Sequence, residues 1–189
     1  MECGNGAKAI IRSYGGNCFS YVTKDGVEVM GVRKDAIDPR ADTKPYAGGA
    51  PHCFPQFGPG VLMQHGFARG MKFVPGEQSS KDSMSFKLLP TEDTKKIWDH
   101  DFEYKMDVSL KADSLEWDLV VSNNGDKPFD ITMGMHNYFD VSSLSNILIS
   151  GPFANSKAVD KVSGSSSVAD RCVSYSIVFA IEEVTISVN

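Results

Sequence analysis

A strict alternation of apolar and polar residues over nine positions is the feature of this sequence that most constrains its fold. The apolar members of this run are Phe102, Tyr104, Met106, Val108 and Leu110. Side chains of a β-strand point to opposite faces in turn, so a period of two predicts a strand with one buried face. The same pattern recurs over residues 115–121 and 129–135. Three such runs in succession predict a sheet.

Turn-forming residues separate these runs and set how the strands pair. Asn123, Asn124, Gly125 and Asp126 lie between the second and third runs, and short turns of this kind join antiparallel neighbours. Weaker alternation predicts further strands at 7–12, 18–23, 27–32, 83–89, 173–179 and 184–188. Only residues 91–100 have a helical pattern, one or two turns long. The sequence therefore predicts an all-β chain, either a sandwich or a strongly bent sheet.

Composition limits the class of protein and its partners. The chain has 189 residues, 41% hydrophobic and 23% charged, which predicts one globular domain over 1–189 rather than a disordered chain. A net charge of −5 without a basic cluster disfavours nucleic acid as a partner.

No run approaches the ~20 apolar residues of a membrane span, and residues 1–8 show no leader pattern. Four widely spaced cysteines favour free thiols in a reducing compartment, so the cytoplasm is the default location.

Two stretches break the strand pattern. Residues 38–70 are rich in glycine and proline yet contain Phe, His, Gln and Arg, a combination that favours a functional segment over disorder. Residues 155–167 are rich in serine and glycine and predict a mobile loop. The sequence finishes just after the strand-like residues 184–188, and we expect a partner protein to cover the edge there.

His136 is the most informative single position. It shares a strand face with Asp130, Thr132 and Gly134, so the period of two directs its imidazole away from the main core. That small, polar face suits the lining of a binding cleft, where an imidazole exchanges protons near neutral pH. A surface or structural histidine is the alternative interpretation.

Residues 64–69 place an amide, an imidazole and a guanidinium close together in Gln64, His65 and Arg69. Gln and His form hydrogen bonds with sugar hydroxyls and Arg binds anions, although a loop with incidental polar residues is the alternative. A metal site built from His52, His65 and His136 is conceivable, but no ligand spacing supports it.

These motifs resemble the aldose 1-epimerase superfamily, and within it the branch of glucose-6-phosphate 1-epimerases, or hexose-6-phosphate mutarotases. The resemblance rests on KPYAGGAPHCFPQFG (44–58), QHGFAR (64–69), TKKIW (94–98) and GMHNYFDV (134–141), and it extends over about 6–162, with 163–189 divergent. It implies a galactose-mutarotase-like β-supersandwich, incomplete at its C-terminus.

The resemblance also implies a reaction and roles for particular residues. The family interconverts α and β anomers by removing the proton of the anomeric hydroxyl and protonating the ring oxygen, without metal or nucleotide cofactors. His136 would be the acid, Gln64 and Arg69 would hold the substrate, and His65 would support the sugar ring. Arg69 is then the expected contact for the phosphate of a sugar phosphate.

Three departures from the family pattern bear on activity. Ala47 stands where the family usually carries a substrate-binding Arg before its Gly-Gly pair. The catalytic glutamate has no counterpart, because neither Glu182 nor Glu183 lies in the expected motif. The substrate-binding Asp has only a weak match, Asp170.

We therefore expect a degenerate epimerase-like protein with little or no turnover, acting as an accessory subunit of a larger assembly. An active hexose-6-phosphate 1-epimerase and a carbohydrate-binding module are the alternatives. If the chain is processed or belongs to a larger complex, an organelle such as the plastid replaces the cytoplasm as its expected location.

Overall fold

The computed structural model of the chain describes ten stretches. They are residues 1–4, 6–32, 48–76, 80–143, 147, 149–150, 157–159, 164–168, 172–173 and 186–188. The chain divides into two compact units, Met1–Asp140 with Thr185–Asn189, and Val141–Val184. Each unit is described by itself, and a single domain over 1–189 stays a prediction.

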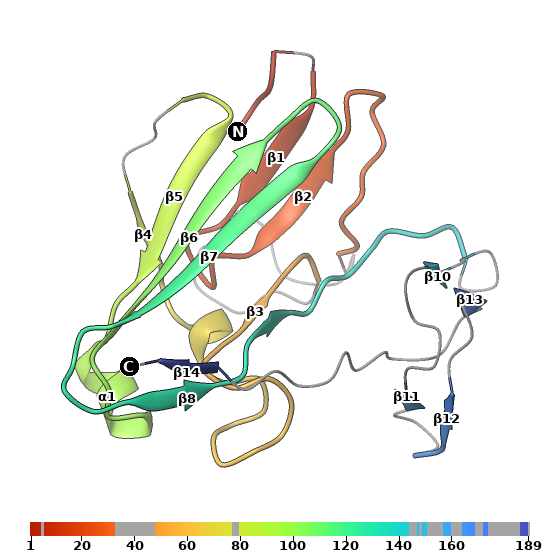
Figure 1. Ribbon diagram of the computed structural model, residues 1–189. Helices are drawn as coiled ribbons and strands as arrows, with labels where there is room; N and C mark the ends of the chain where they lie inside the picture. Colours follow the sequence, from red (N-terminus) through yellow and green to blue (C-terminus); the bar gives the residue numbers. More distant parts are fainter. Residues whose placement is uncertain are drawn as a thin grey trace. The chain divides into compact units, whose positions relative to one another are not determined.

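An antiparallel four-stranded sheet is the largest element of the first unit (Figure 1). Its strands follow in the order β4 (Val74–Pro75), β5 (Ser83–Leu88), β6 (Phe102–Leu110) and β7 (Leu115–Asn123). The strand predicted at 102–110 is confirmed residue for residue, and its burial alternates at every position. Those predicted at 83–89 and 115–121 are also confirmed, with small shifts at their ends. The described part of the chain consists mostly of strands, with one short α-helix and one 3₁₀ turn, and confirms the predicted all-β class.

A hairpin of β1 (Lys8–Ile11) and β2 (Cys18–Val22) forms a second, two-stranded sheet. Its connection passes through Gly15 and Gly16, both at positive φ, a conformation that side chains with a Cβ rarely adopt. Gly15 also approaches the backbone of Arg69, because an added Cβ would lie 2.8 Å from that carbonyl oxygen. The hairpin thus supports the segment that carries a predicted site residue.

Aromatic rings form the centre of the core beneath the four-stranded sheet. Phe54 packs against Tyr104 at 4.7 Å and Phe102 at 5.4 Å between ring centroids, and all three are buried. Trp98 packs on Phe102 and Phe129 at 5.5 and 4.8 Å. Burying rings of this size supplies much of the driving force for folding. The core therefore joins the sheet to the Gly/Pro-rich segment through Phe54.

The strand predicted at 27–32 is replaced by isolated bridges, from Glu28 to Val22, Met30 to Phe139 and Val32 to Gly48. The Glu28 carboxylate accepts hydrogen bonds from the backbone N–H groups of Tyr21, Val29 and Met30, and the Val29 N–H also donates to the Tyr21 carbonyl at 2.9 Å. A side chain that shares backbone donors in this way competes with a continuous ladder.

The predicted helical segment is a short helix, α1 (Glu92–Ile97). Thr91 and Thr94 form a capping box at its start: the Thr91 side chain accepts from the Thr94 N–H, and the Thr94 side chain accepts from the Thr91 N–H. This reciprocal capping satisfies donors that the first turn leaves without partners.

The strand predicted at 129–135 is divided into β8 (Phe129–Ile131) and β9 (Gly134–Met135). Between them the Thr132 N–H donates to the Pro55 carbonyl and the Thr132 hydroxyl accepts from the Phe57 N–H, so the chain changes partners there. β9 then pairs with β3 (His52–Cys53), and β8 pairs with β14 (Ile186–Val188). The strand predicted at 184–188 therefore has a neighbour in its own chain, and a partner protein at this edge stays a prediction.

Among the described residues of the second unit there are two short antiparallel pairs. β10 (Ile149–Ser150) pairs with β13 (Cys172–Val173), and β11 (Lys157–Val159) pairs with β12 (Ser166–Val168). The second pair corrects the loop predicted at 155–167, because two paired strands lie there, with Gly164 at positive φ. Residues 174–179 of the strand predicted at 173–179 lie outside the described part.

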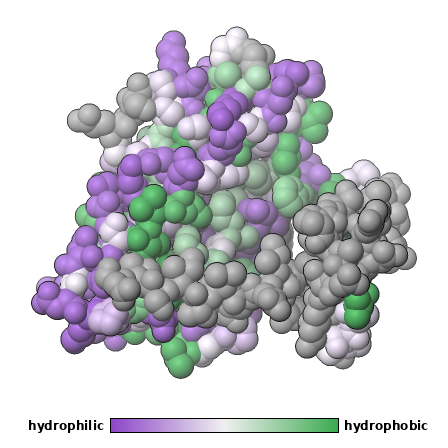
Figure 2. Space-filling view, viewed as in Figure 1, coloured by the Kyte–Doolittle hydropathy of each residue, from purple (hydrophilic) through white to green (hydrophobic). Residues whose placement is uncertain are grey.

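The surface mixes polar and apolar side chains. Figure 2 shows a group of apolar residues in the middle of the visible face, bordered by hydrophilic ones. In the described part of the chain, no helix is both long enough and apolar enough to cross a bilayer. Cys3, Cys18 and Cys53 are free thiols.

Candidate functional site

The β3–β9 pair places His136 at the surface. The His136 N–H donates to the Pro51 carbonyl at 2.9 Å, and the Tyr138 N–H donates to the Gly49 carbonyl at 2.8 Å, continuing the pairing beyond the strands. His136 is exposed, whereas Phe129 and Ile131 on the other face of the segment are buried. The prediction that the His136 imidazole points away from the core is confirmed.

His65 lies beside His136 at the end of a tight loop. Its φ is +69°, in the left-handed region that non-glycine residues seldom occupy. Two hydrogen bonds join it to Gly58: the His65 N–H donates to the Gly58 carbonyl at 3.0 Å, and the Gly58 N–H donates to His65 Nδ1 at 3.1 Å. Both the backbone and the ring of His65 are therefore held by one residue across the loop.

Three rings form the centre of the candidate site. The His65 and His136 centroids are 5.4 Å apart with planes at 79°, and His136 stacks on Tyr138 at 5.0 Å and 29°. Sequence reasoning did not select Tyr138, although it follows His136 by two residues, the spacing that repeats a strand face. We name His65, His136, Tyr138, Gln64 and Arg69 the imidazole cluster.

Arg69 supplies the positive charge of the cluster. It lies in the 3₁₀ turn η1 (Ala68–Gly70) with its side chain exposed, and its NH2 donates to the Gln64 carbonyl at 3.0 Å. Burial, followed by the positive charges of Arg69 and His136, lowers the pKa of His65. This shift favours the neutral form of the His65 ring.

The hydrogen bond from Gly58 sets the tautomer of that neutral ring. Since Nδ1 accepts the Gly58 N–H, the ring proton is assigned to Nε2, following the hydrogen-bond network. The Gln64 side-chain amide lies 3.5 Å from the same Nε2, so with this tautomer its oxygen faces the ring and accepts from Nε2–H. His65 thus carries its donor on Nε2, next to Gln64.

The structure brings together Gln64, His65, Arg69 and His136 of the predicted site. Asp170 lies outside the described residues, as do Ala47, Glu182 and Glu183. Within the described part of the chain, the rings that contact His136 are His65 and Tyr138, and no carboxylate pairs with its imidazole.

His52 belongs to the core and does not join the other two histidines. It is 0% exposed, and its Nδ1 lies 2.6 Å from the Tyr104 hydroxyl. Burial, partly offset by a backbone hydrogen bond at Gly16, lowers the pKa of His52 to about 4. Among the residues that the structure describes, no group of three or more His, Cys, Asp or Glu could hold a metal ion.

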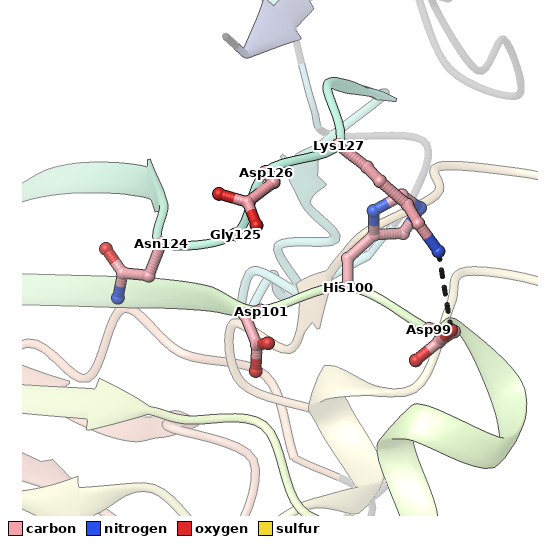
Figure 3. Close-up of a pocket in the computed structure, with 7 residues that line it drawn as sticks. All are labelled: Asp99, His100, Asp101, Asn124, Gly125, Asp126 and Lys127. Carbon is pink, nitrogen blue, oxygen red and sulfur yellow. Dashed lines mark ion pairs between the residues drawn. The ribbon is translucent and has the colours of Figure 1, made fainter.

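A separate polar pocket of about 270 Å³ lies between the start of β6 and the β7–β8 turn (Figure 3). Asp99, Asp101 and Asp126 line it together with Lys127, which pairs with Asp99 at 3.9 Å. Lys95 pairs with Asp101 at 2.5 Å. Three carboxylates against paired lysines repel an anionic ligand, so we place the candidate site at the imidazole cluster.

The strand architecture and the imidazole cluster define a mutarotase-like β-protein. The chain belongs to the aldose 1-epimerase family, whose model matches residues 1–162, and this confirms the family resemblance. A protein of the grass Cenchrus ciliaris, provisionally named glucose-6-phosphate 1-epimerase, is 34% identical over 155 residues, covering 76% of this chain and 46% of its own length. A protein of the same name from Escherichia coli is 33% identical over 121 residues, and the match covers 61% of this chain and 39% of the length of that protein.

Solved structures show the same fold. A crystal structure titled as that of a provisional mutarotase from Salmonella typhimurium has a TM-score of 0.76 at 25% identity and covers 89% of this chain. A galactose mutarotase related enzyme from Lactobacillus acidophilus has a TM-score of 0.74 at 22% identity and covers 93% of this chain. The two matches cover 57% and 64% of the lengths of the Salmonella and Lactobacillus proteins. The chain spans less than half the length of each curated relative described above.

Proposed function

We propose that the imidazole cluster binds a hexose 6-phosphate and that this chain turns it over little or not at all by itself, acting as an accessory subunit. The observation that carries the proposal is the pairing of His65 and His136, 5.4 Å apart, beside the exposed Arg69. The provisional names of the grass and bacterial relatives point to the same sugar.

Each group in the cluster suits one part of such a ligand. The Nε2–H of His65 donates to a hydroxyl or ring oxygen, and the exposed His136 ring can donate or accept. Tyr138, 44% exposed, offers an apolar ring against a sugar face. The Arg69 guanidinium forms charge-assisted hydrogen bonds with a phosphate.

Low turnover follows from what these groups can do with protons. Anomer exchange needs a base at the anomeric hydroxyl and an acid at the ring oxygen. His136 can serve as the acid, but His65 cannot serve as the base: its Nδ1 accepts from Gly58 and its Nε2 carries the proton. Among the described residues no carboxylate forms an ion pair with the His136 imidazole, so none is assigned here as the base.

An active hexose-6-phosphate 1-epimerase is the second candidate. The exposure of His136 favours it, because the imidazole is open to solvent and to a sugar. The two candidates differ in turnover and share the binding site, so one set of measurements separates them.

The test combines calorimetry with exchange NMR on the purified chain. We expect glucose 6-phosphate to bind more tightly than glucose and its anomers to exchange at the uncatalysed rate. Catalysed exchange that His136→Ala abolishes would establish the active enzyme, and equal affinities for the two sugars would indicate a carbohydrate-binding module. No binding of either sugar would overturn the proposal.

A further inference from the structure

The side chain of Gln56 is folded into the loop that ends at His65. It is only 9% exposed, and its amide faces the loop backbone. The amide nitrogen lies 3.1 Å from the Gly58 carbonyl, 3.3 Å from that of Leu62 and 3.5 Å from that of Met63. The Leu62 N–H donates to the amide oxygen at 3.0 Å. Three acceptors around the nitrogen and one donor at the oxygen fix the orientation of the amide.

This arrangement makes Gln56 the internal support of residues 58–63. Gly60 lies so close that an added Cβ would overlap Oε1 of Gln56, which shows how tightly the loop closes on the amide. Val61 at the tip is fully exposed and Met63 mostly so. Besides the backbone hydrogen bonds from His65 to Gly58 and from Gly66 to Met63, the loop is held from inside by the hydrogen bonds to this one side chain.

The same loop supplies the group that fixes His65. Gly58 accepts a hydrogen bond from Gln56 at its carbonyl and donates one to His65 Nδ1 from its N–H. Its neighbour Phe57 donates to the Thr132 hydroxyl at 2.9 Å and packs against the His65 ring at 5.5 Å. A continuous path of contacts thus leads from the Gln56 amide to the His65 ring.

We propose that Gln56 is a positioning residue that holds Gly58 against Nδ1 and so fixes the Nε2–H tautomer of His65. The importance of that tautomer for ligands rests on the proposed function, because a donor at Nε2 suits an acceptor such as a sugar oxygen. Without the amide, the loop backbone loses its shared partner and Nδ1 is no longer reserved for Gly58.

The test reads the tautomer directly, by long-range ¹H–¹⁵N correlation spectra of the His65 ring at pH 7. The wild-type chain is expected to show the Nε2–H form. Gln56→Leu keeps the side-chain bulk and removes all the hydrogen bonds, and it should shift His65 to a mixture of tautomers. Glucose 6-phosphate should then bind about tenfold more weakly, the equivalent of one well-aligned hydrogen bond.

Three further variants separate positioning from general damage. Gly60→Ala leaves Gln56 in place but displaces its amide, and the backbone at Gly60 is not in the glycine-only region, so it should reproduce the tautomer change. Gly70→Ala places its Cβ in open space at an ordinary φ and should leave the His65 spectrum unchanged. Thr94→Val removes a different buried hydrogen bond and should lower stability without affecting the tautomer.

The outcomes distinguish this inference from the proposed function. A folded Gln56→Leu variant that keeps the pure Nε2–H form overturns the positioning role, as does a wild-type His65 that is protonated on Nδ1. A tautomer change in a chain that binds no sugar phosphate supports the positioning role and overturns the proposed function. If Gln56→Leu does not fold, the Gly60→Ala spectrum decides.

Discussion

The two faces of the β3–β9 pair place histidine side chains in opposite environments. On one face His52 is buried beside Tyr104, and burial lowers its pKa to about 4. On the other face His136 is exposed, stacked on Tyr138 and next to His65. His52 is the register partner of Met135, the residue just before His136. Position on a strand, and not residue type, therefore separates a structural imidazole from one available for chemistry.

The largest expected effect is on the buried face. His52→Ala should lower the free energy of unfolding by about 3 to 4 kcal/mol, because it leaves a cavity and removes the partner of the Tyr104 hydroxyl. Urea unfolding followed by tryptophan fluorescence measures this loss. Tyr104→Phe, which removes only the hydroxyl, should cost about 1 kcal/mol. A His52→Ala chain as stable as the wild type would remove the contrast between the faces.

The pH dependence of stability sharpens the same contrast. The folded-state pKa of His52 is about 4, below its ordinary value of 6.5, so between these pH values the unfolded state binds more protons. Stability is therefore fully present above pH 6.5 and falls as the pH approaches 4, by up to about 3 kcal/mol from this residue. His52→Leu should flatten the slope. A slope as steep as that of the wild type in the His52→Leu chain would contradict the assignment.

Ligand affinity tests the exposed face. Arg69→Ala should weaken binding of glucose 6-phosphate by about ten- to a hundredfold, since a charge-assisted hydrogen bond contributes about 1.5 to 3 kcal/mol. Binding of glucose should change little, as calorimetry would show. Lys127→Ala, which removes a cation from the acidic pocket, is the matched control and should leave both affinities unchanged. Equal weakening of both sugars by Arg69→Ala would show that Arg69 does not contact the phosphate.

The smallest expected effect is that of His136→Ala on stability. An exposed ring contributes little to folding, so the free energy of unfolding should stay within about 0.5 kcal/mol of the wild type. Thermal or urea unfolding measures it beside the His52→Ala chain. A loss comparable to that of His52→Ala would mean that the exposed ring stabilises the fold as well as lining the site.

Where a local pattern determines the structure, the sequence was enough to predict it. The alternation over 102–110 predicts β6 completely, because every second residue of this strand is buried under one sheet. Residues 27–32 alternate too, yet the Glu28 carboxylate competes with the backbone for the N–H groups there. Such competition between a side chain and the backbone leaves no trace in hydropathy. The hairpin at 157–168 was missed for a related reason, because its short strands are weakly patterned.

Four of the five residues of the imidazole cluster were selected from the sequence, but their arrangement was not. The motifs at 64–69 and 134–141 select Gln64, His65, Arg69 and His136, which the structure brings together, and their roles stay predictions. The resemblance says nothing of the Gly58 hydrogen bond that fixes the proton on His65, since it depends on a loop closed around Gln56. His52 illustrates the converse: its burial comes from pairing with β9 and from packing on Tyr104, residues far away in the sequence.

The glycine at position 66 decides where this surface can be redesigned. Gly66 has a φ of +64°, and a Cβ there would overlap the Phe54 carbonyl, which also accepts the N–H groups of Phe67 and Ala68. Any larger residue would force the loop away from its scaffold, so this position must be held constant in a library of variants. Diversity belongs instead at the solvent-facing tip around Val61, where new side chains can extend the contact area without disturbing what lies beneath.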